Sequence, residues 1–205
     1  MPNKRTTVTT NSQSGSVKEV QLNVLTFREL WDNYPSGNPY DNSAYRDQCA
    51  IRMSVMFHRV GIEMKSFSEK LIKPASDQPS IGRIILDGKI TATRADELGE
   101  WLKLQPFAGL SRAEDITGAD WESKIKGRTG IVQFSRYWTR RGETAASATG
   151  GHIDLWNGAR LTISSAPDAV ATISRYLGKQ SFFPGTDFGW SDLRNARSIL
   201  FWEIK

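Results

Sequence analysis

The sequence predicts an α+β domain in which helices pack on a mostly antiparallel sheet. Helical patterns come first along the chain, at 27–31 and about 47–60, and several strand patterns then follow one another. Asn157-Gly158 lies between two apolar runs, which is the strongest short-range indication of a β-hairpin. Helices followed by consecutive strands favour separate layers over alternating β-α-β units.

Residues 1–20 are polar and rich in Ser and Thr, so we expect a flexible tail followed by one domain over 21–205. The first residues lack the apolar core of a secretory signal peptide. No apolar run reaches the roughly 18 residues typical of a transmembrane helix. We therefore expect a chain that is made in the cytoplasm, does not insert into membranes and is exported by a route other than general secretion.

The first half of the domain predicts two helices separated by a loop. The segment 33–42 contains two Pro, one Gly and three Asn, which is typical of a loop. The segment 47–60 places apolar residues three and four positions apart, which predicts a helix that Ser43 or Asp47 caps and Gly61 ends.

The second half predicts the sheet. Thr93–Leu104 reads as a helix capped by Thr93, and 140–151 as a loop. A further helix is expected at 166–177. Strands are expected at 81–86, 131–134, 152–156, 160–164 and 198–204. With a two-residue turn at 157–158, the expected cross-strand pairs are Trp156 with Ala159, Asp154 with Leu161, and His152 with Ile163.

Composition limits the chemistry. The net charge is +5 and the pI about 9.4, which favours an anionic partner, but no block of five Lys or Arg occurs, and we expect no nucleic-acid partner. Cys49 is the sole cysteine, which excludes an internal disulfide and a multi-cysteine zinc site. We expect no metal and no cofactor.

Cys49 falls at the predicted first turn of a helix. Backbone N–H groups and the helix dipole stabilise a thiolate at that position. Of the two histidines, His58 lies on the same helix about 13 Å away along its axis, too far to serve the thiol. His152 starts a later strand. A thiol at a helix start and an imidazole on a later strand predict a papain-like hydrolase with Cys49 as nucleophile and His152 as base.

A third residue should orient the imidazole. Asp154 shares a strand face with His152, because side chains alternate along a strand. Thr162 and Ser164, on the opposite strand, are the alternatives. The oxyanion is expected to bind the Cys49 N–H, with the Gln48 side chain as a weaker candidate.

Two sequence blocks resemble a known family. The block Gln48-Cys49-Ala50-Ile51-Arg52-Met53-Ser54 is similar to the Cys-x-Ile-Arg-Met-Ser block of the fourth family of type VI secretion amidase effectors. The block Gly151-His152-Ile153-Asp154-Leu155-Trp156-Asn157-Gly158 is similar to that family's Gly-His-x-x-Leu-Trp-Asn-Gly block.

This resemblance implies an NlpC/P60-type papain-like fold and a peptidoglycan amidase that cuts between D-glutamate and meso-diaminopimelate. It also implies delivery by the type VI secretion apparatus into the periplasm of a rival bacterium and a cognate immunity protein. The roles of nucleophile and base carry over to Cys49 and His152. Members of the family place an Asp shortly after Leu-Trp-Asn-Gly, whereas 159–165 contains no carboxylate here.

Other functions fit parts of the same pattern. One is another papain-like chemistry, such as a transamidase, a protein deamidase or a phage-type lysin. A non-enzymatic alternative is a basic, aromatic-rich module that binds a polyanion or a protein, in which Cys49 and His152 would be structural.

Overall fold

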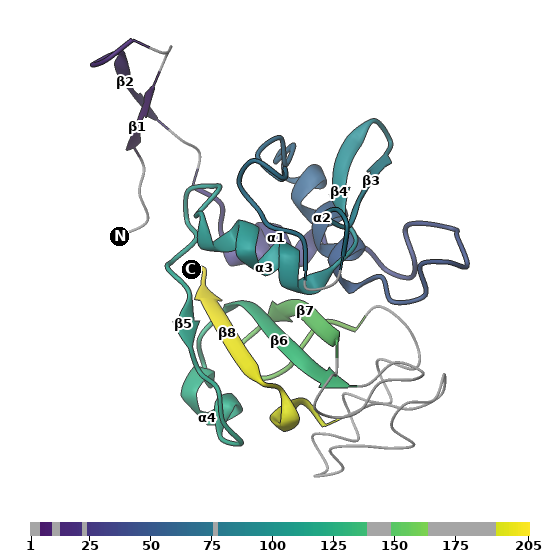
Figure 1. Cartoon of the computed structure of the whole chain (residues 1–205). Coiled ribbons are helices and arrows are strands. Elements are labelled where there is room, and N and C mark those ends of the chain that lie inside the picture. The colour runs from purple at the N-terminus through teal and green to yellow at the C-terminus, as the bar shows by residue number, and fades with distance from the viewer. Residues whose placement is uncertain (1–4, 10–12, 22–23, 76–77, 139–148, 164–191) are drawn as a thin grey trace.

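The computed structural model describes residues 5–9, 13–21, 24–75, 78–138, 149–163 and 192–205. Figure 1 shows a layer of helices above a twisted antiparallel sheet, with a short helix beneath it. The helices are α1 (Phe27–Asp32), α2 (Cys49–Arg59), α3 (Ala95–Lys103) and α4 (Trp121–Ile125). The strands are β1 (Arg5–Thr9), β2 (Val17–Gln21), β3 (Arg83–Leu86), β4 (Lys89–Ala92), β5 (Glu114–Asp115), β6 (Gly130–Trp138), β7 (Gly150–Trp156) and β8 (Ser198–Glu203).

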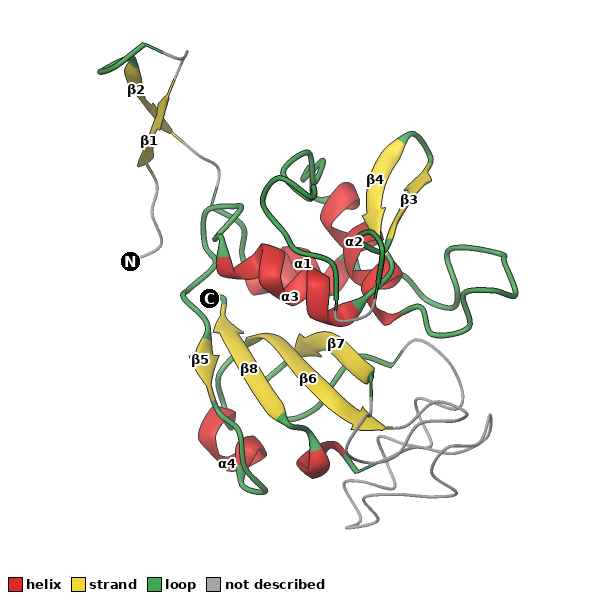
Figure 2. Cartoon of the chain, in the orientation of Figure 1, coloured by secondary structure: helices red, strands yellow, loops and turns green. Residues whose placement is uncertain are grey.

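The main sheet has the order β5-β8-β6-β7, and every pairing in it is antiparallel. β3 and β4 form a separate hairpin beside α2 (Figure 2). The predicted α+β architecture with a mostly antiparallel sheet is confirmed. The order leaves β7 at one edge of the sheet, where residues from outside the sheet can approach its side chains.

The sheet separates two cores. Odd-numbered residues of β6 and β7, such as Ile131 and Ile153, pack against α1, α2 and α3. Even-numbered residues, such as Val132 and Trp156, pack against α4. Three helices thus cover one face as predicted, and α4, which the sequence pattern did not indicate, covers the other.

The N-terminal residues contain regular structure that their polar composition did not predict. Within the expected tail, β1 and β2 pair as an antiparallel hairpin that stands apart from the domain in Figure 1. The flexibility of 1–20 and a domain boundary at residue 20 stay predictions.

Helix starts differ from the expected caps. α1 begins with a capping box, in which the Thr26 hydroxyl accepts from the Glu29 N–H and the Glu29 carboxylate accepts from the Thr26 N–H. The predicted caps Ser43 or Asp47 for α2 and Thr93 for α3 are wrong. Gln48 and Arg94 occupy the two positions, and neither makes a side-chain capping bond.

The predicted pairing after β7 is also wrong. Trp156 pairs with Leu161 instead of Ala159, because 157–160 form a four-residue turn. The Asn157 carboxamide oxygen accepts from the Ala159 and Arg160 N–H groups and fixes this longer turn. The predicted helix at 166–177 lies outside the described residues, as do Ser164 and most of the expected loop at 140–151.

Candidate active site

α2 places Cys49 at the edge of the sheet. Cys49 is the first residue of α2, and its side chain is 9% exposed at the margin of the helix-side core. The helix is held rigidly, because Ala50, Met53 and Met56 behind it are fully buried. The thiol therefore has a fixed position at the positive end of a helix.

β7 supplies the imidazole. His152 pairs with Phe134 of β6, and their rings stack with centroids 6.4 Å apart and an interplanar angle of 23°. The His152 side chain lies close enough to Cys49 to interact with it and retains 24% exposure. The two side chains that the sequence pairs as nucleophile and base thus lie together, and solvent reaches them from the imidazole side.

Asp154 lies on the other side of the imidazole. Its Oδ2 is 3.3 Å from His152 Nε2, and its side chain is 6% exposed. Because Nε2 faces Asp154, Nδ1 is the ring nitrogen left for Cys49. The thiol, imidazole and carboxylate therefore form a continuous series across the edge of β7.

Thr162, one of the alternative third residues, contacts the carboxylate and not the imidazole. Its hydroxyl donates to Asp154 Oδ1 in a short hydrogen bond. The Leu155 N–H donates to the same oxygen at 2.7 Å. Of the candidates that the structure describes, Asp154 is the one that faces His152, and Thr162 holds it in place.

The protonation of His152 follows from these contacts. Burial of the ring lowers the pKa of His152. The interactions with Asp154 and Cys49 outweigh this effect and raise the pKa to about 10. The surroundings of the ring therefore favour the protonated imidazole.

Gln48 has a different role from the one considered for it. The side chain is 2% exposed, and its amide N–H₂ donates to the carbonyls of Tyr40 at 2.5 Å and Tyr45 at 2.9 Å. Its oxygen accepts from the Tyr40 N–H. Both amide protons are used to hold the loop before α2, so Gln48 is not an oxyanion donor in this arrangement. The Cys49 N–H is the donor that the helix start presents.

The glycines before His152 serve packing. A Cβ on Gly150 would lie 2.3 Å from the Trp138 ring, and one on Gly151 would lie 3.2 Å from Asp96 Oδ1 on α3. Both glycines let Trp138 and α3 lie directly against the strand that carries His152.

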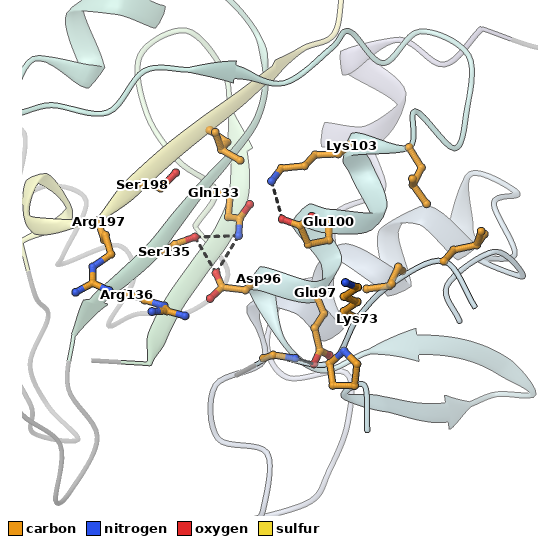
Figure 3. A pocket seen from close by; sticks show the side chains of 16 residues that line it. Lys73, Asp96, Glu97, Glu100, Lys103, Gln133, Ser135, Arg136, Arg197 and Ser198 are labelled. Atoms are coloured by element: carbon orange, nitrogen blue, oxygen red, sulfur yellow. Dashed lines mark hydrogen bonds and ion pairs between the residues drawn. The ribbon is translucent and has the colours of Figure 1, made fainter. Parts of the chain in front are cut away.

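A cavity of about 630 Å³ lies between α3 and the sheet. Figure 3 shows Asp96 at its centre, accepting from Gln133 Nε2 at 2.9 Å and from Ser135 Oγ at 2.8 Å. Neither Cys49 nor His152 lines this cavity. These bonds fix α3 to β6.

Tyr34 is a residue of the site that sequence reasoning missed. It lies in the loop after α1, close to Thr162 and Asp154. Burial, together with the nearby Asp154 charge, raises its pKa well above 10. The loop composition at 33–42 did indicate a segment beside the site, but nothing in the sequence distinguishes Tyr34 from the other aromatic residues there.

Within the described part of the chain, no group of three or more His, Cys, Asp or Glu side chains could hold a metal ion. None of the helices described there has the length and apolar character needed to span a membrane.

The structure is an α+β domain that brings a thiol, an imidazole and a carboxylate together at one edge of its antiparallel sheet. The model of the family described as type VI secretion system (T6SS), amidase effector protein 4 (Tae4) matches residues 45–202. This match covers most of the chain, and the chain belongs to that family. It is therefore a type VI secretion effector of an amidase family.

Solved structures agree with this fold. The Tae4 effector from Enterobacter cloacae has a TM-score of 0.51 and 16% identity, over 91% of this chain and 100% of that one. The Tae4/Tai4 effector–immunity system from Salmonella typhimurium has a TM-score of 0.50 and 16% identity, over 89% of this chain and 100% of that one. No curated protein sequence matches the chain.

Proposed function

We propose that this protein hydrolyses an amide bond in the peptide stem of peptidoglycan, between D-glutamate and meso-diaminopimelate. The observation that carries the proposal is the series Cys49–His152–Asp154 in a chain of an amidase effector family. Cys49 is the nucleophile, His152 the general base and acid, and Asp154 the residue that orients the imidazole.

The reaction begins from the state in which His152 already carries the proton of the Cys49 thiol. The sulfur attacks the carbonyl carbon of the amide, and the resulting oxyanion accepts from the Cys49 N–H at the start of α2. As the tetrahedral intermediate collapses, the C–N bond breaks and the imidazolium protonates the leaving amine. A thioester on Cys49 is left.

Water completes the cycle. His152 takes a proton from a water molecule, the hydroxide attacks the thioester carbonyl, and the acid product leaves as Cys49 recovers its proton. Asp154 favours the protonated ring at each step, because its carboxylate faces Nε2 while Nδ1 serves the sulfur.

The biological setting follows from the family and the substrate. An effector of the type VI system that cuts peptidoglycan acts in the periplasm of the target cell, where the wall lies. Tae4 effectors from Enterobacter cloacae and Salmonella typhimurium form complexes with Tai4 immunity proteins. We infer that this chain also has a cognate immunity protein. A net charge of +5 suits binding to an anionic wall.

The test is digestion of isolated peptidoglycan by the purified protein, followed by analysis of the muropeptides. New free amino groups on diaminopimelate support the proposal. The Cys49→Ala variant should fold normally, release no product and fail to lyse cells when sent to their periplasm. Full lysis by this variant, or an unchanged muropeptide profile with the native protein, contradicts the proposed chemistry.

A further inference from the structure

The cavity between α3 and the sheet contains two oxygen atoms without a donor. Gln133 Nε2 donates to Asp96 Oδ1 at 2.9 Å and to Ser135 Oγ at 3.1 Å. Among the described residues, no N–H or O–H group donates to Asp96 Oδ2 or to Gln133 Oε1. Gln133 is only 3% exposed, and the polar atoms of such buried side chains are normally hydrogen-bonded. Both oxygens are therefore available to a donor on a ligand.

Arg136 lines the same cavity because β6 is irregular at this point. The register of β6 with β7 shifts between Phe134 and Trp138, and Arg136 within this stretch has a φ of 55°, which is rare for a residue other than glycine. Regular alternation would place Arg136 on the face toward α4, where Val132 lies. It lines the cavity beside α3 instead. The irregular strand thus directs a guanidinium into the cavity at a cost in backbone strain.

The charges around the cavity are not all matched within its lining (Figure 3). Glu97 pairs with Arg94 at 2.9 Å, and Glu100 pairs with Lys103 at 2.6 Å. The other charged side chains of the lining are one carboxylate and three cations, namely Asp96, Lys73, Arg136 and Arg197. A guanidinium has five N–H donors, so it can bind a carboxylate beside its other partners. The cavity therefore offers acceptors to an ammonium group and donors to a carboxylate.

One wall of the cavity is apolar. Leu71 and Leu104 line it, although they are 56% and 49% exposed. The volume of about 630 Å³ lies in the range of small-molecule sites, which commonly combine apolar walls with a few polar groups. A ligand that matches this lining has an aliphatic chain with an ammonium group and a carboxylate at one end.

We propose that this cavity binds the free α-amino acid end of meso-diaminopimelate in the peptidoglycan stem. The ammonium group donates to Asp96 Oδ2 and Gln133 Oε1, and the carboxylate accepts from Arg136. The aliphatic chain lies against Leu71 and Leu104. The inference rests on the proposed function for the identity of the ligand. Because neither the thiol nor the imidazole lines this cavity, it is a second contact with the wall and takes no part in bond cleavage.

The test is calorimetric titration of the full chain with free meso-diaminopimelate. We expect a dissociation constant of about 1 mM or lower, as for other ligands of roughly a dozen non-hydrogen atoms. Pimelate lacks the ammonium groups and 1,5-diaminopentane lacks the carboxylates, so each should bind at least about tenfold more weakly. Equal binding of all three compounds, or no binding of meso-diaminopimelate at 10-fold this concentration, overturns the inference.

Two substitutions place the ligand. Asp96→Asn keeps an acceptor for Gln133 and Ser135 but puts an N–H₂ group where Oδ2 was, so it should weaken binding about tenfold or more without a change in melting temperature. Arg136→Gln should weaken binding to a similar extent, and it tests the site independently if Asp96→Asn does not fold. Glu100→Gln, in the same lining but already paired, is the control and should bind as the native protein does. Native affinity in either of the first two variants contradicts the site.

Alkylation of Cys49 separates this cavity from the catalytic groove. Because Cys49 is the sole thiol, iodoacetamide blocks the nucleophile and leaves the cavity unmodified. The alkylated protein should bind meso-diaminopimelate as tightly as the native protein. Loss of binding places the ligand beside the thiol and overturns the inference. Cleavage of muropeptides without any binding of meso-diaminopimelate leaves the proposed function intact and the inference wrong, whereas binding without cleavage refutes only the proposed function.

Discussion

Replacement of Asp154 by Asn tests the orientation of the imidazole directly. The substitution keeps the size of the side chain and removes its charge. Asn can present an acceptor oxygen to the Leu155 N–H and the Thr162 hydroxyl only by turning its N–H₂ group toward His152. A donor then faces Nε2, which favours the neutral ring with its hydrogen on Nδ1, the nitrogen that must accept the thiol proton.

The size of the effect follows from the pKa of His152. A pKa raised from 6.5 to about 10 corresponds to roughly 5 kcal/mol in favour of the imidazolium, contributed jointly by Asp154 and Cys49. If the Asp154 carboxylate supplies about half of this free energy, Asp154→Asn should shift the alkaline limb of the kcat–pH profile to lower pH by roughly 1–2 units. The wrong tautomer should lower kcat by about 10²- to 10⁴-fold, in line with the same change in a serine protease triad.

The free energy of unfolding should also depend on the pKa of His152. A folded-state pKa above the unfolded value of 6.5 stabilises the fold fully below about pH 6.5, and this contribution is lost as the pH rises toward 10. Urea titrations of the native protein should therefore show a falling free energy of unfolding across that window. In Asp154→Asn the fall should be shallower.

The assay combines initial rates on muropeptides with urea titrations between pH 6 and 10. Asp120→Asn is the matched control, because it makes the same change at an exposed residue that pairs with Lys124 on α4. The control should keep native rates. If kcat of Asp154→Asn stays within about threefold of native and its alkaline limb does not move, then Asp154 does not orient His152 and the third residue lies elsewhere.

Two further substitutions test residues outside the site. Glu97→Gln should lower the free energy of unfolding in urea titrations by about 2–3 kcal/mol, because this carboxylate is 1% exposed and accepts from two backbone N–H groups and one arginine. The control Glu100→Gln, in an exposed ion pair, should lower it by less than about 0.5 kcal/mol. Equal losses in the two variants would contradict the argument. His58→Gln should keep native activity, because His58 bonds the Ile90 carbonyl away from Cys49. Burial lowers the pKa of His58, so native stability should fall as the pH drops through 6.5, and this fall should be smaller in the variant.

Local patterns predicted the elements that carry Cys49 and His152. The apolar spacing around Cys49 indicated the helix start within one or two residues, because the buried face of α2 is continuous and ends at Gly61. The apolar run before Asn157 indicated β7 for the same reason. Both residues were found because each lies in an element whose own sequence is consistent with its structure.

The contacts between elements could not be predicted in the same way. Glu97 is buried because it binds backbone groups at Ala75 and Gly82, and a charged residue in a helix gives no sign of partners that far along the chain. The turn after β7 was misjudged because the Asn157 side chain bonds two successive N–H groups and lengthens the turn. These outcomes depend on tertiary packing and side-chain bonding, which periodicity does not describe.

The donors around Asp154 explain how a carboxylate two residues from His152 can lie against the imidazole. Side chains at positions i and i+2 of a strand start about 6.6 Å apart and stand nearly parallel, so by default they do not meet. Here Asp154 Oδ2 comes within 3.3 Å of the imidazole, because Thr162 and the Leu155 N–H hold the other oxygen. These two donors, rather than the geometry of the strand, therefore let Asp154 face His152.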